Sequence, residues 1–240
     1  MVTPLPEMQA RIVLVNTDIH RACERVGRDP RTARVVAVSK AHPAKAVQEA
    51  TWYGLRLFGE SYVQEWQAKA EHPDLVAVPD LRWSFIGRLQ RNKVRFLIGR
   101  VACIESVDTD RLAQEISRRA ADRGTTFRQS VLLQINTNAE PNKSGFRPSE
   151  LMESLPDLLA LPGLSIDGLM HIPAFRSDPE ATRPDHVALR TLRDRLQDRH
   201  GHALPELSMG MSSDFVVAVE EGATRVRVGT GIFGTRPPRD

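Results

Sequence analysis

The sequence predicts a single (β/α)8 barrel of the TIM type, with an extra helix before the first strand. Short apolar, β-branched runs alternate along the chain with segments of helical spacing, and there are eight such runs. Eight parallel strands joined by helical crossovers are the number that closes into a packed barrel. The 240 residues show no internal repeat and no shift in composition. We therefore expect one domain over residues 1–240, with the barrel over about 34–234.

The first element is a helix. Residues 7–26 carry apolar side chains at helical spacing, and the pattern stops at Gly27 and Asp29-Pro30. Only twelve residues, rich in glycine and proline, follow the eighth strand. No standard outer helix can follow that strand, so the helix at 7–26 is expected to cover the gap.

The remaining elements alternate between strand and helix. The expected strands are 34–40, 55–59, 81–87, 101–107, 129–136, 164–170, 206–209 and 224–228. The expected helices are one opened by Pro43 and those at 62–70, 90–97, 111–121, 148–161, 184–200 and 213–221. The turn-rich segment 175–184 is expected to form a loop over the sixth strand.

Composition limits the classes of function. The net charge is only +3, with basic and acidic residues interleaved, which argues against a nucleic-acid partner; the densest basic run, within 88–100, is expected to be the solvated face of a short helix. No apolar run reaches the roughly 18 residues of a membrane span, and no signal peptide is evident. We expect a cytoplasmic protein that does not bind membranes. Cys23 and Cys103 lie far apart, which predicts neither a disulfide framework nor a metal site.

The first strand ends on a lysine, Lys40. An ammonium group at the end of a buried strand must find an anion or lose its proton. Both outcomes suit a lysine that forms a Schiff base. The alternative is a side chain that extends from the strand end to water.

Two loops near the chain's end could hold a phosphate group, which barrels often bind after strands seven and eight. Ser212 or Ser213 is expected to cap the following helix, leaving N–H groups open to an anion. The segment 229–234 contains three glycines, which let backbone N–H groups approach a phosphate closely. A serine cap or a glycine-rich turn alone is usually only structural, but on adjacent strands the two predict a phosphate site.

An arginine on the eighth strand completes the predicted pocket. Arg227 alternates with Val226 and Val228, so it should point into the barrel, where it needs an anion or a strong acceptor. Arg225 has the same parity but should reach toward the opposite mouth. Because strand eight lies beside strand one in a closed barrel, Lys40, Arg227 and both loops converge. A lysine, a phosphate cradle and an arginine are what pyridoxal 5'-phosphate (PLP) requires.

Seven segments of this chain resemble the pyridoxal phosphate homeostasis protein family, also called YggS-like or PROSC-like. In order, they are 37–40 (AVSK), 58–65 (FGESYVQE), 85–93 (FIGRLQRNK), 143–146 (KSGF), 168–170 (GLM), 207–214 (LSMGMSSD) and 226–234 (VRVGTGIFG). The match runs from about residue 34 to 234. The resemblance implies the barrel of the alanine racemase N-terminal domain and PLP binding without an established enzymatic activity.

Position by position, the resemblance makes Lys40 the Schiff-base lysine and sets Arg227 against the pyridine nitrogen of PLP. It assigns the phosphate to Ser212, Gly229 and Thr230. Ile86 and Ser61 complete the implied cofactor contacts.

The chain departs from the family pattern at two positions. Ser61 stands where the family usually has asparagine, and Ser84 where it has histidine, which leaves the contacts near the ring hydroxyl open. Lys143 matches a family lysine after strand five, either as a ligand or as a loop cation.

An arginine at the ring nitrogen disfavours its protonation and makes the ring a poorer electron sink. Relatives that racemise take a tyrosine from a second domain, whereas this chain ends just after the barrel and neither Tyr53 nor Tyr62 lies at a strand end. We therefore expect a monomeric PLP-binding protein of vitamin B6 homeostasis, without catalytic residues or amino-acid turnover. PLP-dependent apoenzymes are its candidate recipients. The alternative is a PLP-dependent, racemase-like enzyme using the same lysine.

Overall fold

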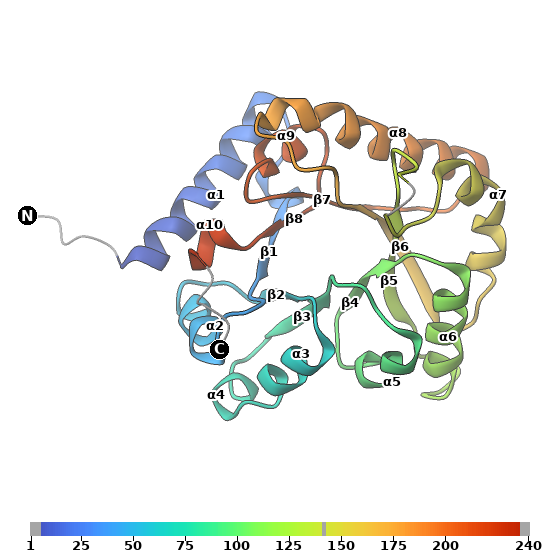
Figure 1. Cartoon of the computed structure of the whole chain (residues 1–240), viewed down its shortest axis with the longest axis horizontal. Helices are drawn as coiled ribbons and strands as arrows, with labels where there is room; N and C mark the ends of the chain where they lie inside the picture. The colour runs from blue at the N-terminus through green and yellow to red at the C-terminus, as the bar shows by residue number, and fades with distance from the viewer. Residues whose placement is uncertain (1–5, 141–142, 236–240) are drawn as a thin grey trace, which may run out of the picture.

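Eight parallel strands form a closed barrel in the computed structural model, which describes residues 6–140 and 143–235. Figure 1 shows the strands at the centre of the molecule and the helices around them. The predicted barrel fold with its N-terminal helix is confirmed. The strands are β1 (Arg34–Val38), β2 (Leu57–Glu60), β3 (Arg82–Phe85), β4 (Cys103–Val107), β5 (Gln129–Ile135), β6 (Leu164–His171), β7 (Glu206–Met211) and β8 (Arg225–Val228).

Helices connect the strands as expected, with two short additions at 73–76 and 230–233. The α-helices are α1 (Glu7–Arg25), α2 (Ala44–Trp52), α3 (Val63–Ala70), α4 (Pro73–Val76), α5 (Val94–Leu97), α6 (Asp110–Ala121), α7 (Pro148–Leu159), α8 (Arg183–His200), α9 (Phe215–Glu220) and α10 (Thr230–Phe233). Single 3-10 turns occupy Pro30–Thr32, Arg91–Lys93 and Pro179–Thr182. No helix among the described residues is both long and apolar enough to cross a membrane.

The helix α1 takes the place of an eighth outer helix. It packs against α9 and α10, and Figure 1 shows it beside both. Its buried face includes Ile12, Val15 and Ile19, and Nε of Arg11 donates a hydrogen bond to the main-chain oxygen of Ile232 over 3.0 Å. The start of the chain therefore closes the gap left after β8, as the sequence predicts.

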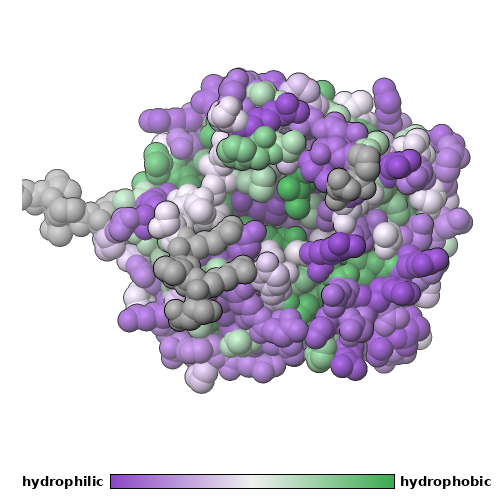
Figure 2. All heavy atoms as spheres, viewed as in Figure 1, coloured by the Kyte–Doolittle hydropathy of each residue, from purple (hydrophilic) through white to green (hydrophobic). Residues whose placement is uncertain are grey.

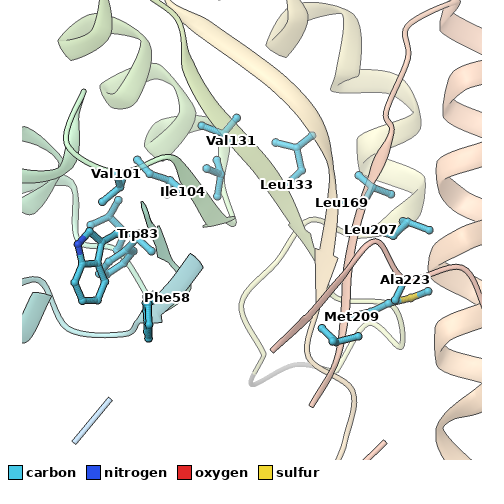
Figure 3. Close-up of a cluster of buried hydrophobic side chains, with 14 of the residues drawn as sticks. Phe58, Trp83, Val101, Ile104, Val131, Leu133, Leu169, Leu207, Met209 and Ala223 are labelled. Carbon is cyan, nitrogen blue, oxygen red and sulfur yellow. The ribbon is translucent and has the colours of Figure 1, made fainter. Parts of the chain in front are cut away.

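Successive residues of each strand point alternately out of the barrel and into its interior, so the strands contribute to two separate cores. Outward-facing residues form the large core between strands and helices, and Figure 3 shows members from successive strands, among them Val131, Leu133 and Leu169. Inside the barrel, a separate small apolar cluster joins Cys103, Leu132 and Met170. The barrel interior also holds buried charged and polar groups, and these support the site described below.

Several predicted boundaries differ from the structure. β1 ends at Val38, two residues before Lys40, because the chain turns there and Ala41 has a φ of 64°. β7 continues to Met211, which shortens the following helix. The expected loop at 175–184 ends earlier, since Pro179–Thr182 forms a 3-10 turn that leads into α8. The basic run within 88–100 is divided between a loop, a 3-10 turn and α5.

Candidate cofactor site

A cavity of about 430 Å³ lies at the carboxyl ends of the strands. Its volume is in the range typical of small-molecule sites. In Figure 2, hydrophobic residues gather in the recessed centre of the viewed face and hydrophilic residues surround it. The lining brings together all seven residues for which the sequence suggests cofactor contacts: Lys40, Ser61, Ile86, Ser212, Arg227, Gly229 and Thr230. Val38, Ile172, Phe175, Met211 and Ser213 complete the lining.

Lys40 reaches this cavity from a turn directly after β1. The turn is closed by a hydrogen bond from the main-chain N–H of His42 to the oxygen of Ser39, over 3.0 Å. The N–H of Ser39 still pairs with the oxygen of Gly59 on β2, at 3.2 Å. The sheet and the turn thus fix the backbone on the N-terminal side of Lys40.

A buried ionic cluster holds both neighbours of Lys40. Nζ of Lys69, on α3, lies 2.8 Å from the oxygen of Ser39, 2.6 Å from Oε1 of Glu60 and 2.8 Å from Oε1 of Glu65. The same oxygen of Glu65 accepts a hydrogen bond from the N–H of Ala41 over 2.5 Å. Ser39, Glu60 and Lys69 are buried. One ammonium group therefore ties together the end of β2, the start of α3 and the turn that carries Lys40.

The electrostatics of this cluster are those of a buried ion pair. Burial raises the pKa of Glu60, and the opposing effects of Lys69 and of the Ser39 hydroxyl only partly offset that rise. Oε2 of Glu60 has no hydrogen-bond partner among the described residues. Removal of Lys69 would thus leave a desolvated carboxylate without its cation.

Neither Ser212 nor Ser213 caps the following helix, so the capping role expected from the sequence is wrong. Asp214 occupies the position before α9, and its Oδ1 accepts a hydrogen bond from the N–H of Met211 over 2.7 Å. Oγ of Ser212 instead accepts hydrogen bonds from the N–H groups of Gly229, at 3.1 Å, and Gly231, at 3.3 Å. The extension of β7 moves the turn forward and places Ser212 against the loop after β8.

The loop after β8 is packed closely around this serine. A Cβ atom on Gly231 would lie 2.9 Å from Cγ1 of Val228, and one on Gly229 would lie 3.4 Å from the oxygen of Val38. The close packing at Gly231 therefore depends on the absence of a side chain there, whereas a Cβ on Gly229 would make ordinary contact with β1. The predicted glycine-rich turn forms a single helical turn, α10.

Arg227 points into the barrel, as its parity predicts, and its side chain is buried. One terminal nitrogen donates to Oγ of Ser208 over 2.7 Å, and the other to the main-chain oxygen of His171 over 2.7 Å. Burial lowers the pKa of Arg227, while Glu105 and Asp214 oppose the change. The guanidinium remains a cation with a fixed orientation beneath the cavity.

Arg225 precedes Arg227 by two residues on β8, and its side chain also lies inside the barrel. It pairs with Oε1 of Glu105 at 3.0 Å and with Oε2 of Glu206 at 3.0 Å. Oε2 of Glu105 accepts a hydrogen bond from Ser208 over 2.6 Å. A continuous polar chain therefore runs from Arg225 through Glu105 and Ser208 to Arg227, and it supplies the negative charge that the buried arginines need.

Two buried histidines lie behind the cavity. Nε2 of His171 is 3.0 Å from Nδ1 of His186, and Nε2 of His186 is 3.2 Å from Oδ2 of Asp214. Burial, together with His186, Arg227 and Lys143, lowers the pKa of His171 well below its usual value. His171 is therefore a neutral imidazole.

Ser61 and Ser84, the two positions that depart from the family pattern, and Lys143 lie in different parts of the structure. Ser61 lines the cavity, whereas Ser84 is buried in β3 and its hydroxyl has no partner among the described residues. Lys143 lines a neighbouring cavity of about 360 Å³. Its Nζ lies 2.6 Å from Oε1 of Glu140.

The sequence analysis did not predict the ionic cluster around Lys69. It also missed the series of hydrogen bonds and ion pairs that connects Arg225 with Arg227. Glu65 and Lys69 stand four residues apart on a predicted helix, which is the spacing of a helical ion pair. That spacing is ordinarily found at the surface, so it gives no sign of burial. No local pattern relates Glu105 to Ser208 or Arg225, since β4 meets the neighbouring strands β7 and β8 only across the interior of the closed barrel.

Comparison with known proteins adds to this geometry. The chain matches the family "Alanine racemase, N-terminal domain" over residues 17–237. It is 45% identical over 227 residues to the pyridoxal phosphate homeostasis protein of Aquifex aeolicus, covering 94% of this chain and 97% of that protein. The chain belongs to the pyridoxal phosphate homeostasis protein family. The human member of this family is 40% identical over 231 residues, covering 92% of this chain and 84% of that protein.

Solved structures agree with that assignment. A structure of PipY from Synechococcus elongatus PCC7942 with PLP bound superposes with a TM-score of 0.78 at 37% identity, covering 90% of this chain and all of that one. An alanine racemase of Clostridium difficile 630 superposes with a TM-score of 0.71 at 16% identity, covering 96% of this chain and 57% of that chain. The second likeness concerns the fold alone. The resemblance noted in the sequence is thereby confirmed.

Proposed function

We propose that this protein binds PLP in the cavity at the carboxyl ends of the strands and serves in PLP homeostasis. The observation that carries the proposal is the convergence of Lys40, Arg227 and the loops at 212–213 and 229–230 on one cavity. PLP bound in a structure of the related PipY protein supports it. We place the protein in the cytoplasm as a single-domain monomer, with PLP-dependent apoenzymes as recipients of the cofactor.

The residues present fit the phosphate of PLP. Because Oγ of Ser212 already accepts two N–H groups, its own proton is directed to a further acceptor. A phosphate oxygen is such an acceptor, and hydrogen bonds to charged groups are stronger than those between neutral groups. Thr230 lines the same side of the cavity and offers a second hydroxyl. Ser212, Gly229 and Thr230 would therefore hold the phosphate.

Lys40 is the only amine that lines this cavity in the described part of the chain. Bound PLP supplies an aldehyde, which condenses with a primary amine. Lys40 would provide that amine, and the Lys69 cluster would hold its backbone in place on both sides. Ile86 and Ser61 would line the remaining walls, and Arg227 would face the pyridine nitrogen.

The cavity favours retention of the cofactor over turnover of amino acids. Racemisation needs a second proton-transfer group facing the lysine. Among the described residues that line the cavity, none is a histidine, a tyrosine or a carboxylate. In the neighbouring cavity, Glu140 and Lys143 pair with each other. Arg227, which is tied to Ser208 and His171, would also disfavour a protonated ring nitrogen.

Hydrogen exchange in deuterated water tests this proposal. The PLP-loaded protein is incubated with L-alanine and D-alanine, and loss of the α-proton is followed by NMR. We expect exchange far below an enzyme-like rate of about 1 per second. Exchange or inversion at such a rate, abolished by Lys40→Ala, would contradict the carrier function and favour a racemase-like enzyme.

A further inference from the structure

A second and larger cavity opens beside the cofactor site. It has a volume of about 950 Å³ and lies over the loops that follow β2, β3 and β4. Among the described residues that line it, Arg88, Arg91, Lys93 and Arg111 are cations and Asp108 is the one carboxylate. We call this feature the arginine groove. These residues give the lining a net charge of +3. The formal net charge of the whole 240-residue chain is also +3, so the positive charge is concentrated in the groove.

The three arginines of the groove have no ionic partner in the described part of the chain. Two arginines further along the chain pair with carboxylates, Arg100 with Glu71 at 2.8 Å and Arg118 with Glu115 at 2.7 Å. Within residues 6–140 and 143–235, by contrast, the side chains of the groove's three arginines make no hydrogen bond and no ion pair. Three like charges around one concave surface repel one another unless an anion lies between them. The groove thus gathers three guanidinium groups that no carboxylate of the described residues neutralises.

The chemistry of the lining indicates the class of ligand. A guanidinium group presents a planar fork of N–H donors that matches the oxygens of phosphate in a bidentate manner. The volume lies at the upper end of small-molecule sites. Phe85, Leu89 and Leu112 are buried in the floor of the groove, and Tyr62, 52% exposed, supplies its accessible aromatic surface.

We propose that the arginine groove is a binding site for a small oligophosphate with three or four negative charges, free or carried by a nucleoside. The site differs from the phosphate loops of the cofactor cavity, and of the cofactor contacts named above it shares only Ser61. The anion would lie between Arg88, Arg91 and Arg111 and neutralise them. A nucleoside would place its base against the exposed ring of Tyr62. The proposal does not depend on PLP binding.

Isothermal titration calorimetry tests the site with two probes, tripolyphosphate and ATP, on the full-length protein at low salt. Each titration is run with and without added PLP, so that failure to bind the cofactor is seen separately. The variant Arg88→Ala/Arg91→Ala/Arg111→Ala should weaken binding of both probes at least tenfold. The matched control, Arg21→Ala/Arg82→Ala/Arg195→Ala, removes the same charge from exposed arginines elsewhere and should change binding less than twofold.

The two probes distinguish the sources of the phosphate. Binding of both with similar affinity assigns the site to the oligophosphate alone, and tighter binding of ATP assigns it to a nucleotide. If neither probe produces a heat of binding, the proposal is overturned. It is also overturned if the control variant weakens binding of the probes as much as the groove variant does. A single-stranded oligonucleotide that displaces tripolyphosphate at lower concentration than ATP does would overturn it in favour of a nucleic-acid surface. Unchanged circular dichroism of both variants excludes unfolding as the cause of a loss.

Discussion

Lys69 donates a hydrogen bond from its ammonium group to the main-chain oxygen of Ser39, over 2.8 Å. Ser39 directly precedes Lys40, the proposed cofactor lysine. Glu65, which pairs with the same ammonium group, accepts the N–H of Ala41 on the other side. The position of Lys40 therefore depends on a buried cation from another element of the fold.

We expect Lys69→Met to destabilise the protein by about 3 to 5 kcal/mol, since it leaves the buried carboxylate of Glu60 without its cation. Urea denaturation measures the change. The double variant Lys69→Met/Glu60→Gln should recover part of the loss, because no uncompensated buried charge remains. The control Lys45→Met, at an exposed site on α2, should stay within about 0.5 kcal/mol of the parent. A loss of the same size in the control would contradict the ionic role of Lys69.

We expect Ser212→Ala and Thr230→Val to weaken PLP binding about ten- to a hundredfold each. Each removes a hydrogen bond to a charged phosphate, worth about 1.5 to 3 kcal/mol. Equilibrium dialysis of the apo-protein against PLP gives the dissociation constants.

Ser213→Ala is the matched control for these variants. Ser213 lines the same cavity but is exposed, and its side chain makes no hydrogen bond within the described residues. The affinity of the Ser213→Ala variant for PLP should differ from that of the parent less than threefold. If all three variants bind like the parent, the phosphate is held elsewhere.

The barrel was predictable because its signals are local. Each signal depends only on residues that are close in sequence: the eight apolar runs, the helical spacing of 7–26 and the alternation of Arg227 with its valine neighbours. Together they predicted the fold and the residues on one side of the barrel's open end. The convergence of Lys40 with Arg227 followed from barrel closure, which pairs β1 with β8.

The capping role of Ser212 was wrong because a capping serine and a serine packed against another loop have the same local pattern. The structure sets Ser212 against the N–H groups of Gly229 and Gly231, seventeen and nineteen residues further along the chain. The burial of Lys69 was equally hidden, since an amphipathic helix with a Glu-Lys pair normally directs that pair to solvent.

Stability should fall with acid because of His171. Its pKa is lowered in the folded state, so the unfolded chain takes up a proton near pH 6.5 while the folded chain does not. The unfolded state then binds more protons, and the free energy of unfolding decreases as the pH falls below about 6.5. One such proton contributes a slope of up to about 1.4 kcal/mol per pH unit.

Urea denaturation between pH 5 and pH 8 measures this slope. His171→Asn should reduce the slope by the contribution of about one proton. His20→Asn, at an exposed site on α1, serves as the control substitution. Carboxylates away from this site contribute equally to all three proteins, so the difference between slopes reports His171 together with its contact to His186. The same slope in His171→Asn and the parent would show that His171 is not the titrating group.

Borohydride reduction of the PLP-loaded protein, followed by peptide mass spectrometry, tests the central claim most directly. Reduction makes a Schiff base permanent and marks the lysine that formed it. We predict a yellow protein whose reduced adduct maps to Lys40 and is absent from Lys40→Ala. An adduct on Lys45 or Lys143, or none at all in a protein that retains PLP, would contradict the assignment of Lys40 as the residue that holds the cofactor.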